Sequence, residues 1–103
     1  RLALTSQAPT LLPNYPNPFN PETWIPFDLP ASGEVTITIY GTRGEVVRRI
    51  ALGSLTAGLY RTRGKAARWD GRNAVGEAVP SGVYVYELRV GDYHAARRMV
   101  VRK

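Results

Sequence analysis

Cysteine is absent from this sequence of 103 residues, and histidine occurs once, at His94. The lack of cysteine excludes disulfide frameworks, structural zinc ribbons and thiol nucleophiles. A lone imidazole needs partners for acid–base chemistry, and no carboxylate stands at a fixed offset from His94, so we expect it on the surface. No serine lies in a nucleophile-elbow context, and the carboxylates are too dispersed for a calcium loop. We therefore predict no catalysis, metal or cofactor; a small hydrolase using His94 is the minor alternative.

Long apolar runs and helical periodicity are also missing. No run approaches the roughly 18 apolar residues that span a membrane, and no segment keeps a 3.6-residue apolar period over three turns. The start, residues 1–4, lacks the apolar core and cleavage site of a signal peptide. We expect that any export signal lies upstream or is something other than an N-terminal peptide, and that the chain was cut from a longer polypeptide. The length is that of one domain.

Acidic residues are scarce relative to basic ones. Fourteen Lys and Arg residues, twelve of them Arg, stand against eight Asp and Glu, giving a net charge of +6. Arginine makes planar contacts to carboxylate and phosphate, so an anionic surface polysaccharide is a candidate partner. A solvated basic surface is the simpler interpretation. Nucleic acid is not expected, because no helix could enter a groove and no basic run is continuous.

The sequence does contain repeated period-two alternation, which predicts β-strands. The predicted strands cover residues 23–29, 35–40, 45–52, 83–90 and 93–102, with shorter ones around Leu11 and ending at Trp69. Pro26 indicates an edge strand or an unpaired position in a ladder, and the mismatched faces of Val47 and Ile50 indicate a bulge or a twist. About seven strands with turn residues between them predict an all-β antiparallel sandwich. We assign residues 1–13 to a linker tail and first short strand, and residues 14–103 to the sandwich.

A proline- and asparagine-rich segment near the N-terminus is the most distinctive local feature. Prolines fix the backbone and remove donors, while asparagines bond to neighbouring backbone groups. We interpret the segment as a rigid cap that two aromatic rings pin to the sandwich, with a recognition surface as the alternative. Its residues are Tyr15, Pro16, Asn17, Pro18, Phe19, Asn20 and Pro21.

A second motif lies around Trp69. Tryptophan at a strand end usually fills a sandwich core, and Asp70 and Gly71 supply turn geometry. Gly82 and Tyr84 follow at the start of the next strand. Carbohydrate stacking on Trp69 or Trp24 is an alternative, although each tryptophan stands alone in the sequence.

With both motifs in place, the chain resembles the C-terminal type A sorting domains of proteins exported by the type IX secretion system. These are similar to the immunoglobulin-like domain of the flagellar hook-capping protein. The resemblance extends from residue 14 to the C-terminus, except that residues 59–68 form a longer segment, where we expect an added turn near residues 63–65. It rests on the following residues: Tyr15, Pro16, Asn17, Pro18, Phe19, Asn20, Pro21, Thr23, Ile25, Phe27, Leu29, Val35, Ile37, Ile39, Tyr40, Gly44, Val46, Val47, Ala57, Gly58, Trp69, Asp70, Gly71, Arg72, Gly76, Pro80, Ser81, Gly82, Val83, Tyr84, Ala96, Arg97, Arg98, Met99, Val100, Val101 and Lys103.

This resemblance implies an immunoglobulin-like or fibronectin-III-like sandwich that follows a cargo domain in the same chain. It implies that an outer-membrane translocon recognises the folded domain, and that processing machinery removes it and attaches the cargo to the cell surface. The alternative is a non-catalytic accessory or assembly module that binds a protein or polysaccharide. We predict that recognition uses the last hairpin, with these candidate residues: Arg89, Arg97, Arg98, Met99, Val100, Val101, Arg102 and Lys103.

Overall fold

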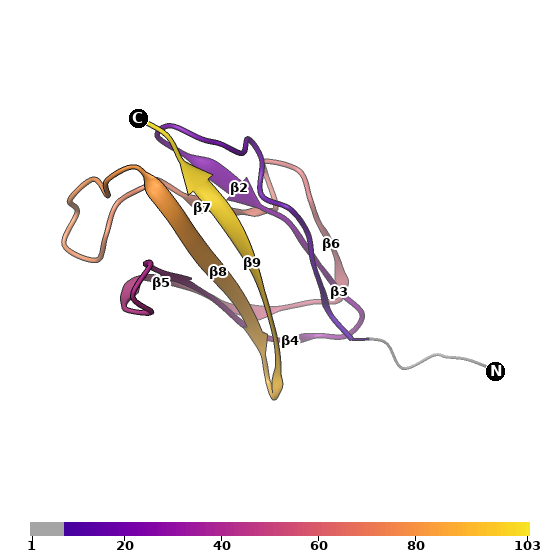
Figure 1. Cartoon of the computed structure of the whole chain (residues 1–103). Coiled ribbons are helices and arrows are strands. Elements are labelled where there is room, and N and C mark those ends of the chain that lie inside the picture. Colours follow the sequence, from indigo (N-terminus) through magenta and orange to yellow (C-terminus); the bar gives the residue numbers. More distant parts are fainter. Residues whose placement is uncertain (1–7) are drawn as a thin grey trace.

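The computed structural model describes residues 8–103, and this part of the chain is built from strands without helices (Figure 1). The predicted all-β class is confirmed. Residues 1–7, most of the predicted linker tail, lie outside the described residues. Residues 8–103 contain no helix long and apolar enough to cross a membrane. The strands are β1 (Thr10–Leu11), β2 (Thr23–Ile25), β3 (Phe27–Leu29), β4 (Gly33–Tyr40), β5 (Val46–Leu55), β6 (Gly58–Tyr60), β7 (Ala67–Trp69), β8 (Gly82–Val90) and β9 (Tyr93–Val101).

One layer of the sandwich is a four-stranded antiparallel sheet in the order β5-β4-β8-β9. Of its central strands, β8 alternates as predicted, and β4 does so except that Thr38 is also buried. In β8 the side chains of Tyr84, Tyr86 and Leu88 are buried, whereas Val83 and Arg89 face solvent. Residues two apart share a face of a strand, so this alternation fixes which face of the sheet meets the core.

The second layer consists of two short ladders, β1-β3-β6 and β2-β7. Pro26 separates β2 from β3 inside the segment predicted as one strand. Because proline has no N–H to donate, the ladder is interrupted there and the chain changes partner from β7 to β6. The turn expected near residues 63–65 is also present, and it separates β6 from β7, the strands that pair with β3 and β2. In this turn the carbonyl of Thr62 accepts hydrogen bonds from the amides of Lys65 and Ala66. These two interruptions explain why residues 8–103 contain nine strands where about seven were predicted.

The predicted bulge in the return strand is confirmed. The β4–β5 register shifts twice, between Val35 and Thr36 and between Ile39 and Tyr40. At the first shift, Gly53 adopts a φ of 78°, in the left-handed region that glycine enters without steric cost. β5 is an edge strand of the sheet, and all of its residues are half-buried or exposed.

The two layers enclose one apolar core. Trp69 and Tyr86 are its largest fully buried side chains, as expected for Trp69. Burying a large apolar side chain contributes about 1.5–3 kcal/mol, so the core is the main source of stability. Its buried members are Leu11, Phe19, Ile25, Phe27, Leu29, Val35, Ile37, Ile39, Ala67, Trp69, Val79, Tyr84, Tyr86, Leu88, Met99 and Val101.

Candidate functional site

The proline-rich segment, residues 15–21, is the cap loop, and it is hydrogen-bonded to the last strand. The amide of Phe19 donates to the carbonyl of Val100 at 3.1 Å, and the amide of Arg102 donates to the carbonyl of Phe19 at 3.0 Å. The amide of Val100 also donates to Oδ1 of Asn17 at 3.0 Å. The loop thus lies beside the C-terminal end of β9 (Figure 1). Two sequence features some eighty residues apart form one structural unit.

Aromatic packing joins the motif around Trp69 to the same unit. The Phe19 ring meets the Trp69 ring edge-on, with centroids 5.6 Å apart, and Tyr84 meets Trp69 at 5.9 Å. The Trp69 indole N–H donates to the carbonyl of Arg72 at 2.9 Å. A Cβ at Gly71 would lie 2.4 Å from the carbonyl oxygen of Pro21, so only glycine allows this close approach. The structure therefore supports the rigid-cap interpretation of residues 15–21.

A buried polar cluster anchors the start of the cap loop to the four-stranded sheet. The Tyr86 hydroxyl donates to the carbonyl of Leu12 at 2.8 Å and accepts from the amide of Asn14 at 2.9 Å. The Asn14 side chain donates to the Thr23 hydroxyl at 3.0 Å, and that hydroxyl donates to the carbonyl of Pro16. Buried polar groups need such partners, because an unpaired one costs about 1–3 kcal/mol.

Replacing Tyr86→Phe should lower the free energy of unfolding by about 1–2 kcal/mol at pH 7, since Leu12 and Asn14 each lose a partner. Burial raises the pKa of the Tyr86 hydroxyl, while the Asn14 amide and Arg97 oppose the shift. The folded chain therefore favours the neutral phenol, and its stability falls as pH rises above about 10. Urea unfolding from pH 7 to 11 should show a shallower alkaline fall for Tyr86→Phe; an unchanged slope would contradict this account.

Asn17→Ala should loosen the join between the cap loop and β9 without unfolding the domain. It removes the acceptor of the Val100 amide in an exposed position, at a cost of about 0.5–1.5 kcal/mol. Hydrogen exchange should speed up at Val100 and stay unchanged at central amides such as that of Ile37. Uniform acceleration at both positions would show a global effect instead.

The predicted recognition residues divide into two groups. Met99 and Val101 are 1% and 2% exposed and belong to the core, so they support the fold and offer no surface to a partner. Val100 is half-buried, and the remaining five residues are exposed. The exposed ones are Arg89, Arg97, Arg98, Arg102 and Lys103.

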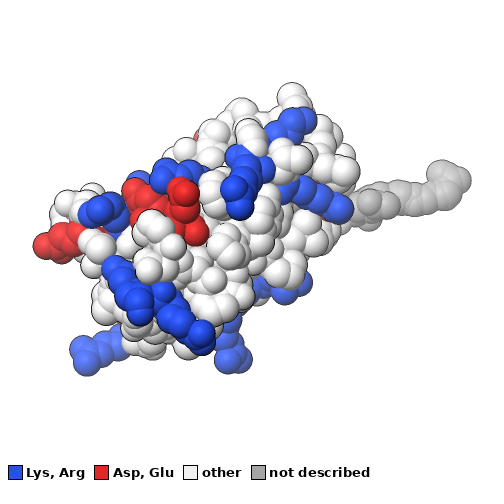
Figure 2. All heavy atoms as spheres, turned by 90° about the horizontal axis from the view of Figure 1, so that it is seen from above, with Lys and Arg blue, Asp and Glu red and all other residues white. Residues whose placement is uncertain are grey.

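These basic side chains do not gather into one patch. Arg89 lies 3.6 Å from a carboxylate oxygen of Glu87, and Arg97 donates from Nε to the carbonyl of Leu11 at 2.9 Å. Figure 2 shows Lys and Arg scattered over one face, with an acidic group between them. Of the exposed basic residues, Arg102 and Lys103 directly follow β9, and the backbone of Arg102 is hydrogen-bonded to Phe19 in the cap loop. The amide of Lys103 donates to the Ser81 hydroxyl.

His94 lies at the surface, as expected, with 61% of its side chain exposed and Nδ1 3.6 Å from Glu87. Trp24 differs from expectation because it does not stand alone. Its ring stacks with Tyr15 at a centroid separation of 6.3 Å, and the Arg63 guanidinium lies 4.3 Å from its centroid. Sequence reasoning missed this cluster, because only the pairing of residue 15 with residue 24 brings the rings together. Among residues 8–103, no three His, Cys, Asp or Glu side chains are grouped closely enough to hold a metal ion.

The two-layer antiparallel arrangement, with its cap loop locked to the last strand, defines an immunoglobulin-like β-sandwich module. Residues 25–92 match the FlgD Ig-like domain. The chain therefore belongs to the FlgD Ig-like domain family.

Two solved structures resemble the chain. The crystal structure of dimeric latent PorU from Porphyromonas gingivalis matches 95% of the chain with a TM-score of 0.70 and 18% identity. That of FlgD from P. aeruginosa matches 72% of the chain with a TM-score of 0.55 and 28% identity. The chain covers 10% of the PorU chain and 56% of the FlgD chain, so it corresponds to a part of each. No curated protein matches the sequence.

Proposed function

We propose that this chain is a sorting domain, a folded address through which a type IX translocon exports an attached cargo protein to the cell surface. The observation that carries the proposal is that the cap loop is hydrogen-bonded to the last strand, β9. Phe19 bonds to Val100 and Arg102 through its backbone and fills the core beside Trp69 with its ring. A translocon that recognises this end of the domain would contact a surface that exists only after folding.

The extent of the structural matches favours this function over an accessory module of the hook-capping kind. The family match ends at residue 92 and starts at residue 25, so it leaves out both the cap loop and β9. The match to PorU extends over 95% of the chain, and the resemblance to type IX sorting domains likewise extends from residue 14 to the C-terminus. The FlgD match supports the alternative, a non-catalytic accessory or assembly module that shares the sandwich and binds a protein or polysaccharide partner.

The proposed role needs no chemistry from the domain itself. Its partners are the translocon, the machinery that processes and attaches the cargo, and the cargo domain that precedes it. The exposed arginines near the C-terminus suit acidic partner surfaces, and an anionic surface polysaccharide remains a second candidate. The destination under this proposal is the cell surface or the medium.

A reporter fusion tests the proposal. A stable periplasmic enzyme is placed before residues 1–103, behind an export signal, in cells with an active type IX system and in matched cells lacking the translocon. We expect the reporter to reach the surface in the first strain and to stay in the periplasm in the second. A folded, intact fusion that stays in the periplasm of both strains would overturn the sorting function and favour the accessory module.

A further inference from the structure

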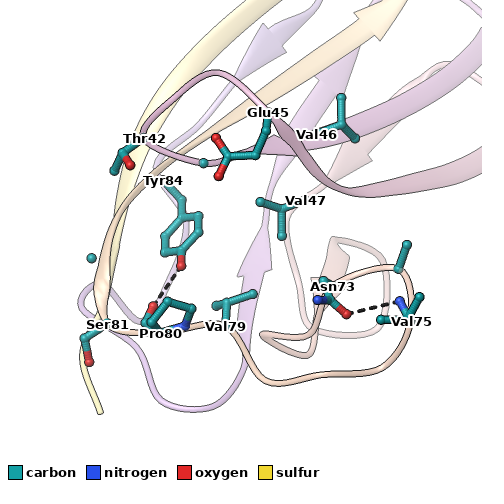
Figure 3. Close-up of a pocket in the computed structure, with 13 residues that line it drawn as sticks. Thr42, Glu45, Val46, Val47, Asn73, Val75, Val79, Pro80, Ser81 and Tyr84 are labelled. Atoms are coloured by element: carbon teal, nitrogen blue, oxygen red, sulfur yellow. Dashed lines mark hydrogen bonds between the residues drawn. The ribbon is translucent and has the colours of Figure 1, made fainter.

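A pocket opens at one end of the sandwich, between the turn of residues 41–45 and the loop of residues 73–82 (Figure 3). Its volume is about 480 Å³, within the range of roughly 300–1,000 Å³ that small ligands and side chains occupy in proteins. Glu45 and Val47 lie on one side of the space, and Val79 and Pro80 lie across from them. The pocket shares no lining residue with the cap loop or with β9.

Apolar side chains form much of the wall and the rim of this pocket, beside polar ones such as Thr42, Asn73 and Ser81. Val79 and Tyr84 are buried at its base and belong to the core. At the rim, Val46 is 47% exposed and Val75 is 78% exposed. Two of the four exposed large hydrophobic residues in the described chain thus line one pocket. Exposed apolar groups that gather around a hollow mark a binding surface, whereas scattered ones need no explanation.

A single carboxylate lies among these apolar groups. The Glu45 side chain packs on Gly41, where a Cβ would lie 2.2 Å from its Oε2, and its Oε1 accepts a hydrogen bond from the Arg43 amide at 3.0 Å. Within residues 8–103 it forms no ion pair, although the chain carries a net charge of +6. An unpaired carboxylate beside an apolar surface favours a ligand that carries a cation next to an apolar group.

Hydrogen bonds hold both sides of the pocket in place. The amide of Ala74 donates to the carbonyl of Val47, which ties the loop to β5. Oδ1 of Asn73 accepts from the amides of Val75 and Glu77 (Figure 3 shows the first), and this closes the loop on itself. The Tyr84 hydroxyl donates to the carbonyl of Pro80 at 2.8 Å. A site held open in this way loses little conformational entropy when a ligand enters.

We propose that this pocket binds a short segment of a partner protein that presents an apolar side chain next to a lysine or arginine. The apolar side chain fills the hollow between Val47, Val75 and Val79, and the cation pairs with Glu45. Complementarity to the unpaired Glu45 carboxylate and to the apolar side chains around it selects this occupant. The proposal goes beyond export and does not depend on it.

Titration of the isotope-labelled chain with short peptides tests the proposal by amide NMR shifts. The probes are N-acetylated, C-amidated Gly-Leu-Lys-Gly and its matched control Gly-Leu-Gln-Gly. We expect saturable shifts at Val46, Ala74 and Val75, with the lysine peptide binding roughly fivefold more tightly, as one exposed ion pair allows. Glu45→Gln keeps the acceptor for Arg43 and should make the two peptides equal. Val75→Ser, at an exposed site, should weaken both.

Glu34→Gln is the matched control variant, because it removes an exposed carboxylate on β4 that lies outside the pocket. It should leave the preference for lysine unchanged. Absence of saturable shifts, shifts centred elsewhere, or a lysine preference that survives Glu45→Gln would overturn the proposal. Shifts at the pocket that grow with protein concentration alone would assign it to a second copy of this chain and would also overturn it.

Discussion

Trp69→Ala should lower the free energy of unfolding by about 3–5 kcal/mol, a large part of the 5–15 kcal/mol typical of a small domain. Trp69 is fully buried, and its ring packs against Phe19 on one side and Tyr84 on another. Its removal leaves a cavity between the two layers and frees the carbonyl of Arg72. Urea unfolding followed by circular dichroism measures the change.

Trp24→Ala is the matched control for this substitution. Trp24 is half-buried and contacts Tyr15 and Arg63 on the surface of the second layer, so its removal should cost only about 1–2 kcal/mol. Equal losses for the two variants would contradict the assignment of Trp69 as the residue that joins the cap loop to the core.

The triple variant Arg98→Gln, Arg102→Gln and Lys103→Gln should reduce export of an attached reporter roughly tenfold while leaving the fold intact. All three side chains are exposed, and none forms an ion pair within the described residues. Each exposed ion pair with a partner contributes about 0.2–1 kcal/mol of binding free energy. Losing three such pairs is therefore expected to cost about 1.4 kcal/mol, which is a tenfold loss of affinity. The ratio of surface to periplasmic reporter gives the effect.

Deleting residues 93–103 would not separate recognition from folding, because it removes the whole of β9 and with it the core residues Met99 and Val101. The matched control for the triple variant is Arg43→Gln, Arg49→Gln and Lys65→Gln, which makes the same change of charge at exposed sites on β5 and in turns. Export that falls equally in both variants would indicate an effect of net charge and would contradict recognition through the end of β9.

Local sequence patterns predicted the central strands and the core, because alternation and side-chain size act over a few residues. The face of β8 that carries Tyr84, Tyr86 and Leu88 followed directly from period-two alternation. Trp69 was placed in the core because a large aromatic residue at a strand end gains most by burial. The bulge in β5 followed from the mismatch between Val47 and Ile50.

Features that depend on contacts between residues far apart in the sequence could not be predicted from these local patterns. No local signal shows that Phe19 pairs with β9, that Trp24 meets Tyr15 and Arg63, or that Pro26 divides one strand between two partners. Basic residues that looked clustered along the sequence are separated in space by the alternation of β9 and by the contact of Arg97 with Leu11. The pocket beside Glu45 arises from two turns about thirty residues apart in the sequence, so it becomes visible only in the fold.

The central claim is that the folded domain, more than any linear segment of it, directs export. The most direct measurement compares the surface fraction of a reporter fused to the intact chain with that of the same reporter fused to the Trp69→Ala chain. Both fusions are expressed in type IX-active cells, at a temperature at which only the variant is unfolded. The account predicts surface display of the intact fusion and periplasmic retention of the variant, although the exposed residues of β9 are identical in both. Equal display of the two fusions would contradict it.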